Sequence, residues 1–488
     1  MSQYRLSKSK ILSGIQCPKR LYLEVHHPEL AVEDEELARR FSIGHQVGEV
    51  AQQLCPGGKL IEYDDGLSRA LEETQLLLRE PPKNSIFEAT FAHNGVLIRA
   101  DLLGWGERGY RLTEVKASTS VKDYHYTDCA IQSWVIEGEG YPLERIELAH
   151  IDNSFVYPGG DDYLGLLHHE DITEAVLALK DQVPGWVEGF KAHLAGEMPE
   201  IETGSHCTDP FDCPFFDHCS PEERPEYPVT ALPRGGKVAE ALLAEGIEDI
   251  RDIPEGYLRN ENHERVRRIT ASGQPELHPE AGEYLRSLPY PLYYLDFETI
   301  QFAVPIWAGT RPYRQLPFQW SCHIEDEPGK LRHAEFLDTS GNAPMRPLAE
   351  KLLATLGDDG PIFVYGSFEK TRLTELAEMF PDLSDGLDSL IGRLVDILPL
   401  TRRSYYHPEM KGSWSIKAVL PTVAPELNYE DLEEVQHGTA AQLAYLEAID
   451  PATTKSRQNE LKNNLLEYCK MDTLALVKLA YFLQSAEI

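Results

Sequence analysis

The chain has 488 residues, of which 42% are hydrophobic, 9% aromatic and 26% charged. Because a typical domain has roughly 150 residues, this length predicts two or three domains, and the apolar content excludes a disordered chain. The formal net charge of −34 argues against indiscriminate binding of polyanions, although a groove on an acidic protein can be locally basic or can hold metal ions.

No apolar run approaches the ~18 residues that a membrane span requires, and residues 1–10 lack the apolar core of a signal peptide. We therefore expect a soluble globular protein of the cytoplasm. Eight cysteines in a chain of this length do not indicate a disulfide framework, so their spacing is more informative than their number.

The first predicted elements lie in residues 1–225, which mix helical stretches with strand-like runs and predict one domain. A helix is predicted around residues 41–51, and it places His45 among small residues. A neutral imidazole binds divalent metals, so His45 is a candidate metal ligand. A lone histidine is more often a core residue with satisfied hydrogen bonds, and that alternative stays open.

A hairpin is predicted next. The apolar run of residues 96–101 ends at Asp101, a glycine-rich turn follows, and the run of residues 110–116 contains Glu114 and Lys116. Because side chains alternate along a strand, Glu114 and Lys116 share one face. Carboxylates can bind Mg²⁺, and an adjacent ammonium can polarise the attacking water or neutralise charge on a phosphate. A solvated ion pair on an edge strand is the simpler alternative.

This arrangement resembles the PD-(D/E)XK nucleases of the RecB branch, which includes the CRISPR-adaptation exonucleases. The matching residues, in chain order, are Gly44, His45, Gly48, Glu88, Asp101, Glu114, Lys116 and Gln132. The resemblance implies a restriction-endonuclease-like fold. The implied metal ligands are His45, Asp101 and Glu114, the implied catalytic residue is Lys116, and the implied substrate-binding residues are Glu88 and Gln132. The tyrosine that usually follows this glutamine by four positions is Ile136 here.

Four of the cysteines form a pattern of one plus three. Cys17 lies near the N-terminus, and Cys207, Cys213 and Cys219 are separated by five residues each. Four thiolates can ligate a 4Fe-4S cluster and tie the chain ends of a domain together. The pattern is similar to the one that closes RecB-type domains with such a cluster, in which the first of the last two gaps is usually shorter. Zinc held by the same thiolates is the alternative.

A proline-rich stretch, residues 221–233, predicts a domain boundary, and residues 226–287 have the pattern of a helical connector. Residues 232–237, followed by residues 246–250, resemble a helix-hairpin-helix, in which backbone amides and a lysine bind DNA phosphates without sequence preference. A plain helical spacer is the alternative.

The third predicted domain, residues 288–488, opens with a short apolar run that is bounded by proline and suits a buried strand. The run ends at Asp296 and Glu298, which project to the same side because side chains alternate along a strand. Far downstream, apolar residues at intervals of three and four predict a helix with Tyr468 and Asp472 on its inward face.

A buried carboxylate at Asp472 needs a basic partner or a divalent cation, and the other conspicuous charges of this domain are acidic. A metal ion therefore fits better. Several carboxylates on a strand and a helix can hold two Mg²⁺ or Mn²⁺ ions, which activate a water and stabilise the leaving oxygen of a phosphodiester. Tyr468 is in a position to orient that water.

These residues resemble the DEDD exonucleases, which have an RNase H-like fold. Asp296-Phe-Glu298 is similar to their first motif, and Tyr468-x-x-x-Asp472 resembles their tyrosine-type third motif. All four residues are therefore predicted to belong to the active site, with the three carboxylates as metal ligands.

The middle motif of that superfamily usually reads Asn-x-x-Phe-Asp, and here Gly366 and Glu369 stand in its place. Glutamate also binds a hard metal ion, so we predict Glu369 as the fourth catalytic ligand and keep Asp396 as the alternative. Residues 412–420 resemble the stretch that precedes the last helix in these enzymes, which suggests that Lys417 approaches a substrate phosphate.

Together the two resemblances cover most of the chain and are similar to a bacterial family that fuses a RecB-like iron–sulfur nuclease domain to a DEDD exonuclease domain. We therefore expect an α/β protein that is a metal-dependent DNA nuclease. The C-terminal site is expected to trim 3′ ends, and the N-terminal site to cut single-stranded DNA or DNA ends. The alternatives are a nucleic-acid-binding scaffold with one live centre and an RNA-processing nuclease.

Overall fold

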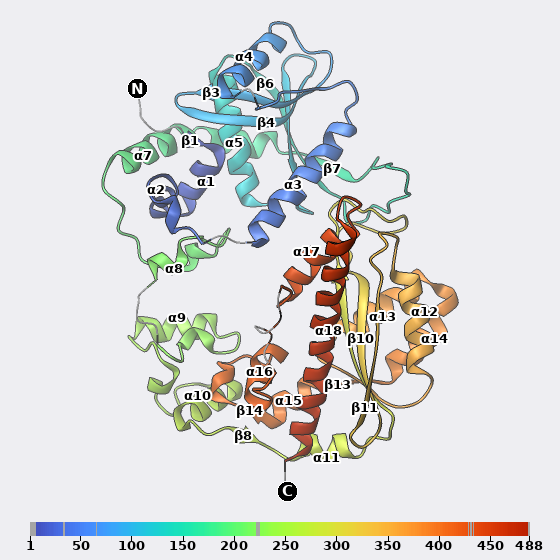
Figure 1. The fold of residues 1–488 in the computed structure, drawn as a ribbon. Coiled ribbons are helices and arrows are strands. Elements are labelled where there is room, and N and C mark those ends of the chain that lie inside the picture. Colours follow the sequence, from blue (N-terminus) through green and yellow to red (C-terminus); the bar gives the residue numbers. More distant parts are fainter. Residues whose placement is uncertain are drawn as a thin grey trace. The chain divides into compact units, whose positions relative to one another are not determined.

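The structure is a computed structural model, and it shows a mixed α/β protein (Figure 1). The residues that it describes are 6–32, 35–64, 66–220, 225–427, 429, 432 and 434–486, with the backbone alone for residues 35–38. The chain forms two compact units. Unit 1 consists of Met1–Glu222 and Phe302–Arg314, and unit 2 consists of Glu223–Gln301 and Gln315–Ile488. Within the described residues, no helix is both long and apolar enough to cross a membrane.

Unit 1 is built on a seven-stranded sheet, in which six strands have the order β2-β3-β4-β5-β6-β7 and the short β1, the seventh, pairs with β4. Its strands are β1 (Leu6–Ser7), β2 (Lys59–Leu60), β3 (Ile86–His93), β4 (Val96–Trp105), β5 (Tyr110–Lys116), β6 (Leu143–Ile151) and β7 (Leu167–Asp171). The predicted hairpin is confirmed, because β4 and β5 pair in antiparallel fashion. Alternate residues of the first part of β4 are buried, and Asp101 lies on the less buried face.

Helices cover this sheet. They are α1 (Lys8–Gln16), α2 (Pro18–His26), α3 (Glu35–Gln53), α4 (Leu67–Leu77), α5 (Asp123–Gly138), α6 (Thr173–Lys180), α7 (Val183–Ala195) and α8 (Phe216–Cys219). α5 packs on β3, β4 and β6 and is itself covered by α1, α6 and α7. Polar side chains on α5, including Asp128 and Gln132, are therefore inside the unit.

A short segment of unit 1 comes from far along the chain. Residues 302–314 follow β9 (Leu292–Ile300) in the sequence but pack within unit 1. The Tyr157 backbone exchanges two hydrogen bonds with this segment, one from Gly309 N to Tyr157 O of 2.8 Å and one from Tyr157 N to Thr310 O of 3.0 Å. The Tyr313 hydroxyl donates to the carbonyl of Ala117, which follows β5. The predicted third domain, residues 288–488, includes this segment, whereas the structure packs it within unit 1.

Unit 2 contains a five-stranded sheet of order β11-β10-β9-β12-β13. The strands after β9 are β10 (Leu316–Glu327), β11 (Lys330–Leu337), β12 (Ile362–Val364) and β13 (Leu394–Asp396). β9 lies at the centre, antiparallel to β10 and parallel to β12. Asp296 and Glu298 occupy the same face of β9, as predicted, and both are less buried than the residues between and beside them.

The helices of unit 2 include those of residues 226–287. Its helices are α9 (Gly236–Ala244), α10 (Glu261–Ser272), α11 (Glu280–Arg286), α12 (Met345–Leu356), α13 (Phe368–Met379), α14 (Ser384–Gly392), α15 (Leu398–Ser404), α16 (Ile416–Val423), α17 (Gly438–Ile449) and α18 (Lys455–Gln484). The short strands β8 (Glu276–Leu277) and β14 (Tyr405–Tyr406) pair with each other and form a separate two-stranded sheet.

α18 and α12 cover opposite faces of the central sheet. The Gln319 side chain on β10 donates to Leu465 O of α18 at 2.7 Å, and the adjacent Trp320 indole donates to Leu348 O of α12 at 3.3 Å. Because neighbouring side chains of a strand point to opposite faces, the two helices lie on different sides. Glu298 pairs with Gln319, so its carboxylate is on the side of α18.

Candidate active sites and cysteine centre

The carboxylates of unit 2 meet between β9 and α18. One ligand atom each of Asp296, Glu298 and Cys469 lies within 4.8 Å of the other two, which is close enough to share a metal ion. The Cys469 thiol, on α18, is 3.7 Å from Oδ2 of Asp296. Asp472 follows Cys469 by less than one helical turn. The predicted residues of the strand and of the last helix are therefore brought together.

Burial and mutual repulsion disfavour ionisation of these groups. Burial raises the pKa of Asp296 well above its usual range, and the charges of Asp472, Glu369 and Glu298 add to the rise. The pKa of Glu298 is likewise raised, first by burial and then by Asp472, while Lys417 opposes the rise. Burial also raises the pKa of Asp472 to about 6. We call Asp296, Glu298, Glu369 and Asp472 the C-terminal acidic centre.

Glu369 comes from a third element, the first turn of α13, and is almost completely buried. Burial raises the pKa of Glu369 to about 7, although a hydrogen bond shared with Asp296 lowers it. Within the described part of the chain, Oε2 of Glu369 has no hydrogen-bond partner. Burying a carboxylate oxygen without a hydrogen-bond donor costs free energy of folding. A cation bound to this oxygen of Glu369 would offset that cost.

Asp396, the alternative metal ligand, instead accepts hydrogen bonds from the backbone. Its Oδ1 accepts hydrogen bonds from Gly366 N at 2.8 Å and Leu398 N at 2.9 Å. Gly366 has a φ of +99°, a conformation that favours glycine. The turn that leads from β12 to α13 thus requires a glycine at Gly366, where the middle motif has another residue. The hydrogen bond from Gly366 to Asp396 holds that turn in place.

Lys417 lies against two tyrosines beside the C-terminal acidic centre. Its Nζ is 5.0 Å from the ring centroid of Tyr429 and 5.3 Å from that of Tyr468, and it donates to Gln436 O at 2.9 Å. Tyr429 donates a hydrogen bond of 2.5 Å to Oδ1 of Asp472. Burial, followed by the charge of Asp472, raises the pKa of both tyrosines, so both hydroxyls keep their protons and can donate.

In unit 1, Glu114 lies at the centre of a second cluster of charged and polar side chains. Its Oε1 accepts hydrogen bonds from Lys116 Nζ at 2.7 Å and from Lys8 Nζ at 2.6 Å. Its Oε2 accepts from Gln132 Nε2 at 2.7 Å. Glu114 is almost fully buried, so these charge-assisted bonds are made away from most of the solvent.

Asp101 and Asp128 complete this cluster. Oδ2 of Asp101 accepts from Val115 N at 2.7 Å, and burial, then the charge of Glu114, raises the pKa of Asp101 to about 7. Lys116 Nζ donates to Oδ2 of Asp128 at 2.7 Å. Although burial opposes its ionisation, the pKa of Asp128 is lowered because Lys116 and Lys8 lie next to it. We call Asp101, Glu114 and Asp128 the N-terminal acidic centre.

Sequence reasoning missed Lys8 and Asp128. A local signal existed for Asp128, since it precedes Gln132 by four residues and shares its face of α5, where both side chains are buried among apolar residues. Lys8 gave no such signal, because its partner Glu114 is 106 positions away. Tyr429 was also missed, since its contact with Asp472 joins residues 43 positions apart.

Two further residues of the predicted N-terminal site lie outside these contacts. Glu88 forms an ion pair with Arg99 at 3.2 Å and adopts a φ of +56° within β3, a strained conformation for a glutamate. His45 is exposed on α3, on the side away from the buried Val47, and none of the contacts described above for the N-terminal acidic centre involves it.

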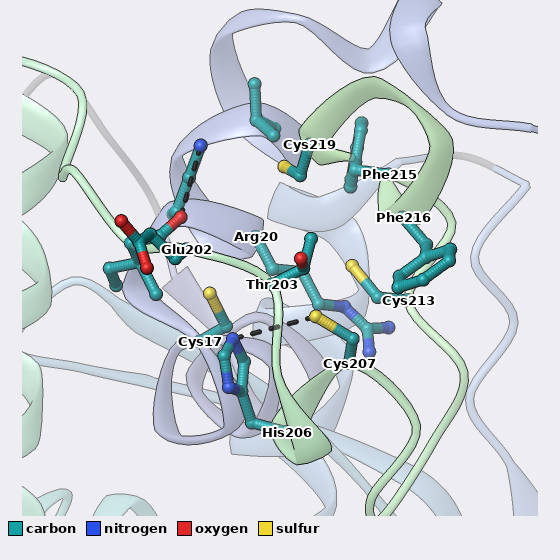
Figure 2. Close-up of a pocket in the computed structure, with 13 residues that line it drawn as sticks. Cys17, Arg20, Glu202, Thr203, His206, Cys207, Cys213, Phe215, Phe216 and Cys219 are labelled. Carbon is teal, nitrogen blue, oxygen red and sulfur yellow. Dashed lines mark hydrogen bonds between the residues drawn. The ribbon is translucent and has the colours of Figure 1, made fainter. Parts of the chain in front are cut away.

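The four patterned cysteines surround one pocket, together with Lys19 and Arg20 (Figure 2). We call Cys17, Cys207, Cys213 and Cys219 the cysteine centre. All four are free thiols. Cys17 lies between α1 and α2, and the other three come from the loop around α8. Burial raises the pKa of Cys213 and Cys219, and the charges of Cys17 and Cys207 add to the rise, because these sulfurs lie near one another.

Comparison with known proteins gives one family model and relatives without a described function. Residues 293–415, which include Asp296, Glu298 and Glu369, match the model of a "Domain of unknown function (DUF2779)". The chain is 25% identical over 212 residues to "Uncharacterized protein MG366" of Mycoplasma genitalium, a match that covers 39% of this chain and 32% of that protein. It is 24% identical over 237 residues to "Uncharacterized protein UU173" of Ureaplasma parvum, covering 44% and 34%.

The chain therefore spans about a third of the length of these curated relatives, 32% and 34% respectively. Among solved structures, it aligns with the "Crystal structure of SSO0001" at 14% identity, over 38% of this chain and 77% of that one. The TM-score of 0.19 is too low for a structural inference.

Proposed function

We propose that this protein is a metal-dependent DNA nuclease with two active sites. Unit 2 is a 3′-to-5′ exonuclease of the DEDD type, and unit 1 is a PD-(D/E)XK nuclease with a 4Fe-4S cluster. The observation that carries the proposal is the C-terminal acidic centre, in which four carboxylates from β9, α13 and α18 converge in a buried place that raises the pKa of each. Such a concentration of acid is a feature of functional sites.

The topology of unit 2 supports an RNase H-like architecture. Numbered along the chain from β9, the strands of the sheet have the order 3-2-1-4-5, and the second strand is antiparallel to its neighbours. This is the strand order of RNase H-like domains, whose first strand carries the first catalytic carboxylate. Asp296 on the central β9 fits that position.

The topology of unit 1 supports a restriction-endonuclease-like core in the same way. Along the chain, α4 is followed by the antiparallel strands β3, β4 and β5, then by α5 and by β6, which is parallel to β5. This α-β-β-β-α-β succession is that of PD-(D/E)XK nucleases, in which the acidic residues lie on the second and third strands. Asp101 on β4 and Glu114 on β5 fit those positions.

The donor set of the C-terminal acidic centre fits Mg²⁺ or Mn²⁺. Both ions prefer carboxylate oxygens, and Asp296, Glu298, Glu369 and Asp472 supply them. The unpartnered Oε2 of Glu369 is the acceptor that such an ion would satisfy. The Cys469 thiol is a poor ligand for these hard ions, and burial raises its pKa, so it stays protonated. When bound, the ions would activate a water and stabilise the leaving oxygen of the phosphodiester.

The protein side chains then have separate tasks. Tyr468 keeps its proton and hydrogen-bonds to Asp472, and we assign to this hydroxyl, beside the acidic centre, the orientation of the attacking water. Lys417 is exposed, and its positive charge near the centre attracts the phosphate of the 3′-terminal nucleotide. Tyr429 holds Asp472 in one orientation through the 2.5 Å hydrogen bond.

For the N-terminal acidic centre we propose a hard metal ion on the carboxylate oxygens of Asp101 and Glu114, and the RecB resemblance implies His45, exposed on α3, as a further ligand. Asp101 keeps one oxygen, Oδ1, clear of the hydrogen bond from Val115, which uses Oδ2. Lys116, held between Glu114 and Asp128, keeps its ammonium beside these carboxylates, where its charge can neutralise the charge that builds up on a phosphate. Glu88 is proposed to support substrate binding, and Gln132, whose amide donates to Glu114, to hold that carboxylate in place.

The cysteine centre supplies four thiolates around one pocket, the number that a 4Fe-4S cluster binds and the set that the RecB resemblance implies for it. Zinc held by the same four thiolates is the alternative. Cys17 would then link the N-terminal helices to the loop around α8.

The proposed substrate is single-stranded DNA or DNA ends. With a net charge of −34, the protein attracts nucleic acid through its metal ions and a few local lysines rather than through its whole surface. The alternatives are an RNA substrate and a nucleic-acid-binding scaffold with one live centre. The Glu369 and Gly366 departures from the middle motif favour that scaffold as the second candidate.

The test is degradation of end-labelled DNA and RNA oligonucleotides of matched sequence with Mg²⁺ or Mn²⁺. We expect stepwise shortening of single-stranded DNA from the 3′ end. Glu298→Gln should abolish this shortening and leave the N-terminal activity intact, and Lys116→Met should do the reverse. Glu327→Gln, an exposed residue at the end of β10, is the matched control. Unchanged 3′ shortening by Glu298→Gln contradicts the exonuclease, and preference for RNA selects the alternative substrate.

A further inference from the structure

Lys8 is the first residue of α1 and reaches into the N-terminal acidic centre. Its Nζ is 2.6 Å from Oε1 of Glu114 and 3.7 Å from Oδ1 of Asp128. The Lys8 side chain is 25% exposed, whereas those of Glu114 and Asp128 are 1% and 4% exposed. Lys8 and Lys116, whose side chain is 24% exposed, therefore both approach the buried carboxylates from the solvent side.

Oε1 of Glu114 is filled by protein donors, whereas Oε2 has a single donor. Oε1 accepts from both Lys8 and Lys116, and Oε2 accepts from Gln132. A carboxylate oxygen offers about two lone-pair sites, so two ammonium groups fill Oε1. A metal ion can bind this oxygen only if one of the two ammonium groups leaves it.

Lys8 is the ammonium that can leave. Lys116 has a second short bond of 2.7 Å to Oδ2 of Asp128, which holds it in the cluster. The distance from Lys8 to Asp128 is 3.7 Å, so that ion pair is looser. If Lys8 moves off Glu114, Oδ1 of Asp128 is its nearest other carboxylate partner, and the positive charge stays compensated there.

We propose that Lys8 and a divalent metal ion compete for Oε1 of Glu114, so that Lys8 sets the metal affinity of the N-terminal acidic centre. This inference rests on the proposed function of that centre. Ion binding moves the Lys8 ammonium from Glu114 toward Asp128, and ion release returns it. Lys8 thereby stabilises the buried carboxylates without metal and limits binding to ion concentrations high enough to displace it.

The backbone of Lys8 is held in place while its side chain moves. At the start of α1, the Ser7 hydroxyl caps the helix by accepting from Lys10 N at 3.3 Å. At its end, the Gln16 amide donates to the carbonyls of His206 at 2.7 Å and Phe211 at 2.6 Å. These bonds tie α1 to the loop of the cysteine centre, so the competition involves the flexible lysine side chain and not a shift of the helix.

The experiment measures Mn²⁺ binding by the loss of the free-ion signal in electron paramagnetic resonance. The full chain carries Asp296→Asn and Glu298→Gln, which remove binding at the C-terminal acidic centre. In this background we expect Lys8→Gln to lower the Kd for Mn²⁺ by about tenfold, because a positive charge beside the ion is removed. Lys8→Met repeats the test with an apolar side chain.

Two controls make the readout specific. Lys8→Arg keeps the charge, and Lys10→Gln removes the same charge from the same helix outside the cluster, so both should leave the Kd within about twofold of the parent. A Kd that is unchanged or higher in both Lys8→Gln and Lys8→Met overturns the competition.

Asp101→Asn in the same background separates the two levels of the proposal. If Asp101→Asn weakens Mn²⁺ binding while the Lys8 variants do not strengthen it, the inference about Lys8 fails and the metal site stands. If Asp101→Asn leaves Mn²⁺ binding unchanged, the metal site of the N-terminal acidic centre fails, and the competition fails with it.

Discussion

Tyr429 donates a hydrogen bond of 2.5 Å to Oδ1 of Asp472, and its ring lies 6.1 Å from that of Tyr468, with Lys417 against both rings. The two tyrosines thus flank one lysine and one carboxylate. Tyr468 also has a side-chain hydrogen bond with Asp472, and this bond, like the one from Tyr429, lowers the pKa of Asp472. The C-terminal acidic centre therefore has a positioning tyrosine in addition to the one in the Tyr-x-x-x-Asp motif.

Replacing Tyr429 should move the acid limb of the pH–rate profile. The hydrogen bond from Tyr429 lowers the pKa of Asp472, which is about 6 with that bond in place. In Tyr429→Phe the pKa of Asp472 rises, so 3′ shortening should fall by roughly tenfold at about pH 6 and recover at about pH 8. Tyr468→Phe should be slow at every pH. An acid limb that does not shift in Tyr429→Phe contradicts the positioning role.

Stability without metal should fall as the pH rises. The folded-state pKa is raised to about 7 at Asp101 and Glu369 and to about 6 at Asp472, in each case mainly by burial. A raised pKa means that the folded state holds the proton more tightly than the unfolded state. The resulting stabilisation is complete below the unfolded pKa of about 4 and is lost as the pH rises through about 6 to 7.

The measurement is the Tm in a chelator between about pH 5 and pH 8. We expect a lower Tm at the higher pH, a smaller difference in Asp472→Asn, and recovery at the higher pH when Mg²⁺ or Mn²⁺ is added. Asp388→Asn, which removes an exposed charge from α14, is the matched control for the overall negative charge. Equal pH dependence of Asp472→Asn and Asp388→Asn would show that the buried carboxylate does not cause the effect.

The parts that sequence could predict are those with a short-range pattern. The alternation of a strand places Asp296 and Glu298 on one face, and the period of a helix places Tyr468 and Asp472 on α18. The bounds of β5 follow from its apolar run and the glycine-rich turn before it. In each case, neighbours in sequence determine the geometry.

The contacts that sequence missed join distant parts of the chain. Lys8 meets Glu114, and Tyr429 meets Asp472, only because folding brings separate elements together. Residues 302–314 were assigned to the third domain because they follow β9, yet their partners are in unit 1. The spacing of motif residues identifies the carboxylates of a site. The counter-ions and hydrogen-bond donors around those carboxylates depend on tertiary packing, which the spacing does not reveal.

The cysteine centre predicts a coloured protein. Purified without oxygen, the wild-type chain should be brown and contain the iron and sulfide of one 4Fe-4S cluster. Cys213→Ser should lose iron and colour, because it removes one of the four thiolates around the pocket. Cys55→Ser, at a half-buried thiol of unit 1 outside the pocket, should keep both. A colourless protein with one zinc per chain would select the alternative metal.

Gln132 provides a test between two roles. The RecB resemblance implies that it contacts substrate, but the structure buries it completely and directs its amide to Glu114 at 2.7 Å and Asp128 at 3.1 Å. Removing the donor leaves buried carboxylate oxygens short of a partner, which costs about 1–3 kcal/mol. Gln132→Leu should therefore lower the free energy of unfolding by about this amount and reduce kcat at the N-terminal site. It should change KM little, because the substrate does not reach a fully buried amide.

Ser133→Ala, the next residue of α5 and equally buried, is the control for packing of the helix. If Gln132→Leu instead raises KM and leaves both kcat and the free energy of unfolding unchanged, Gln132 binds substrate, and the side chain must leave Glu114 when DNA binds.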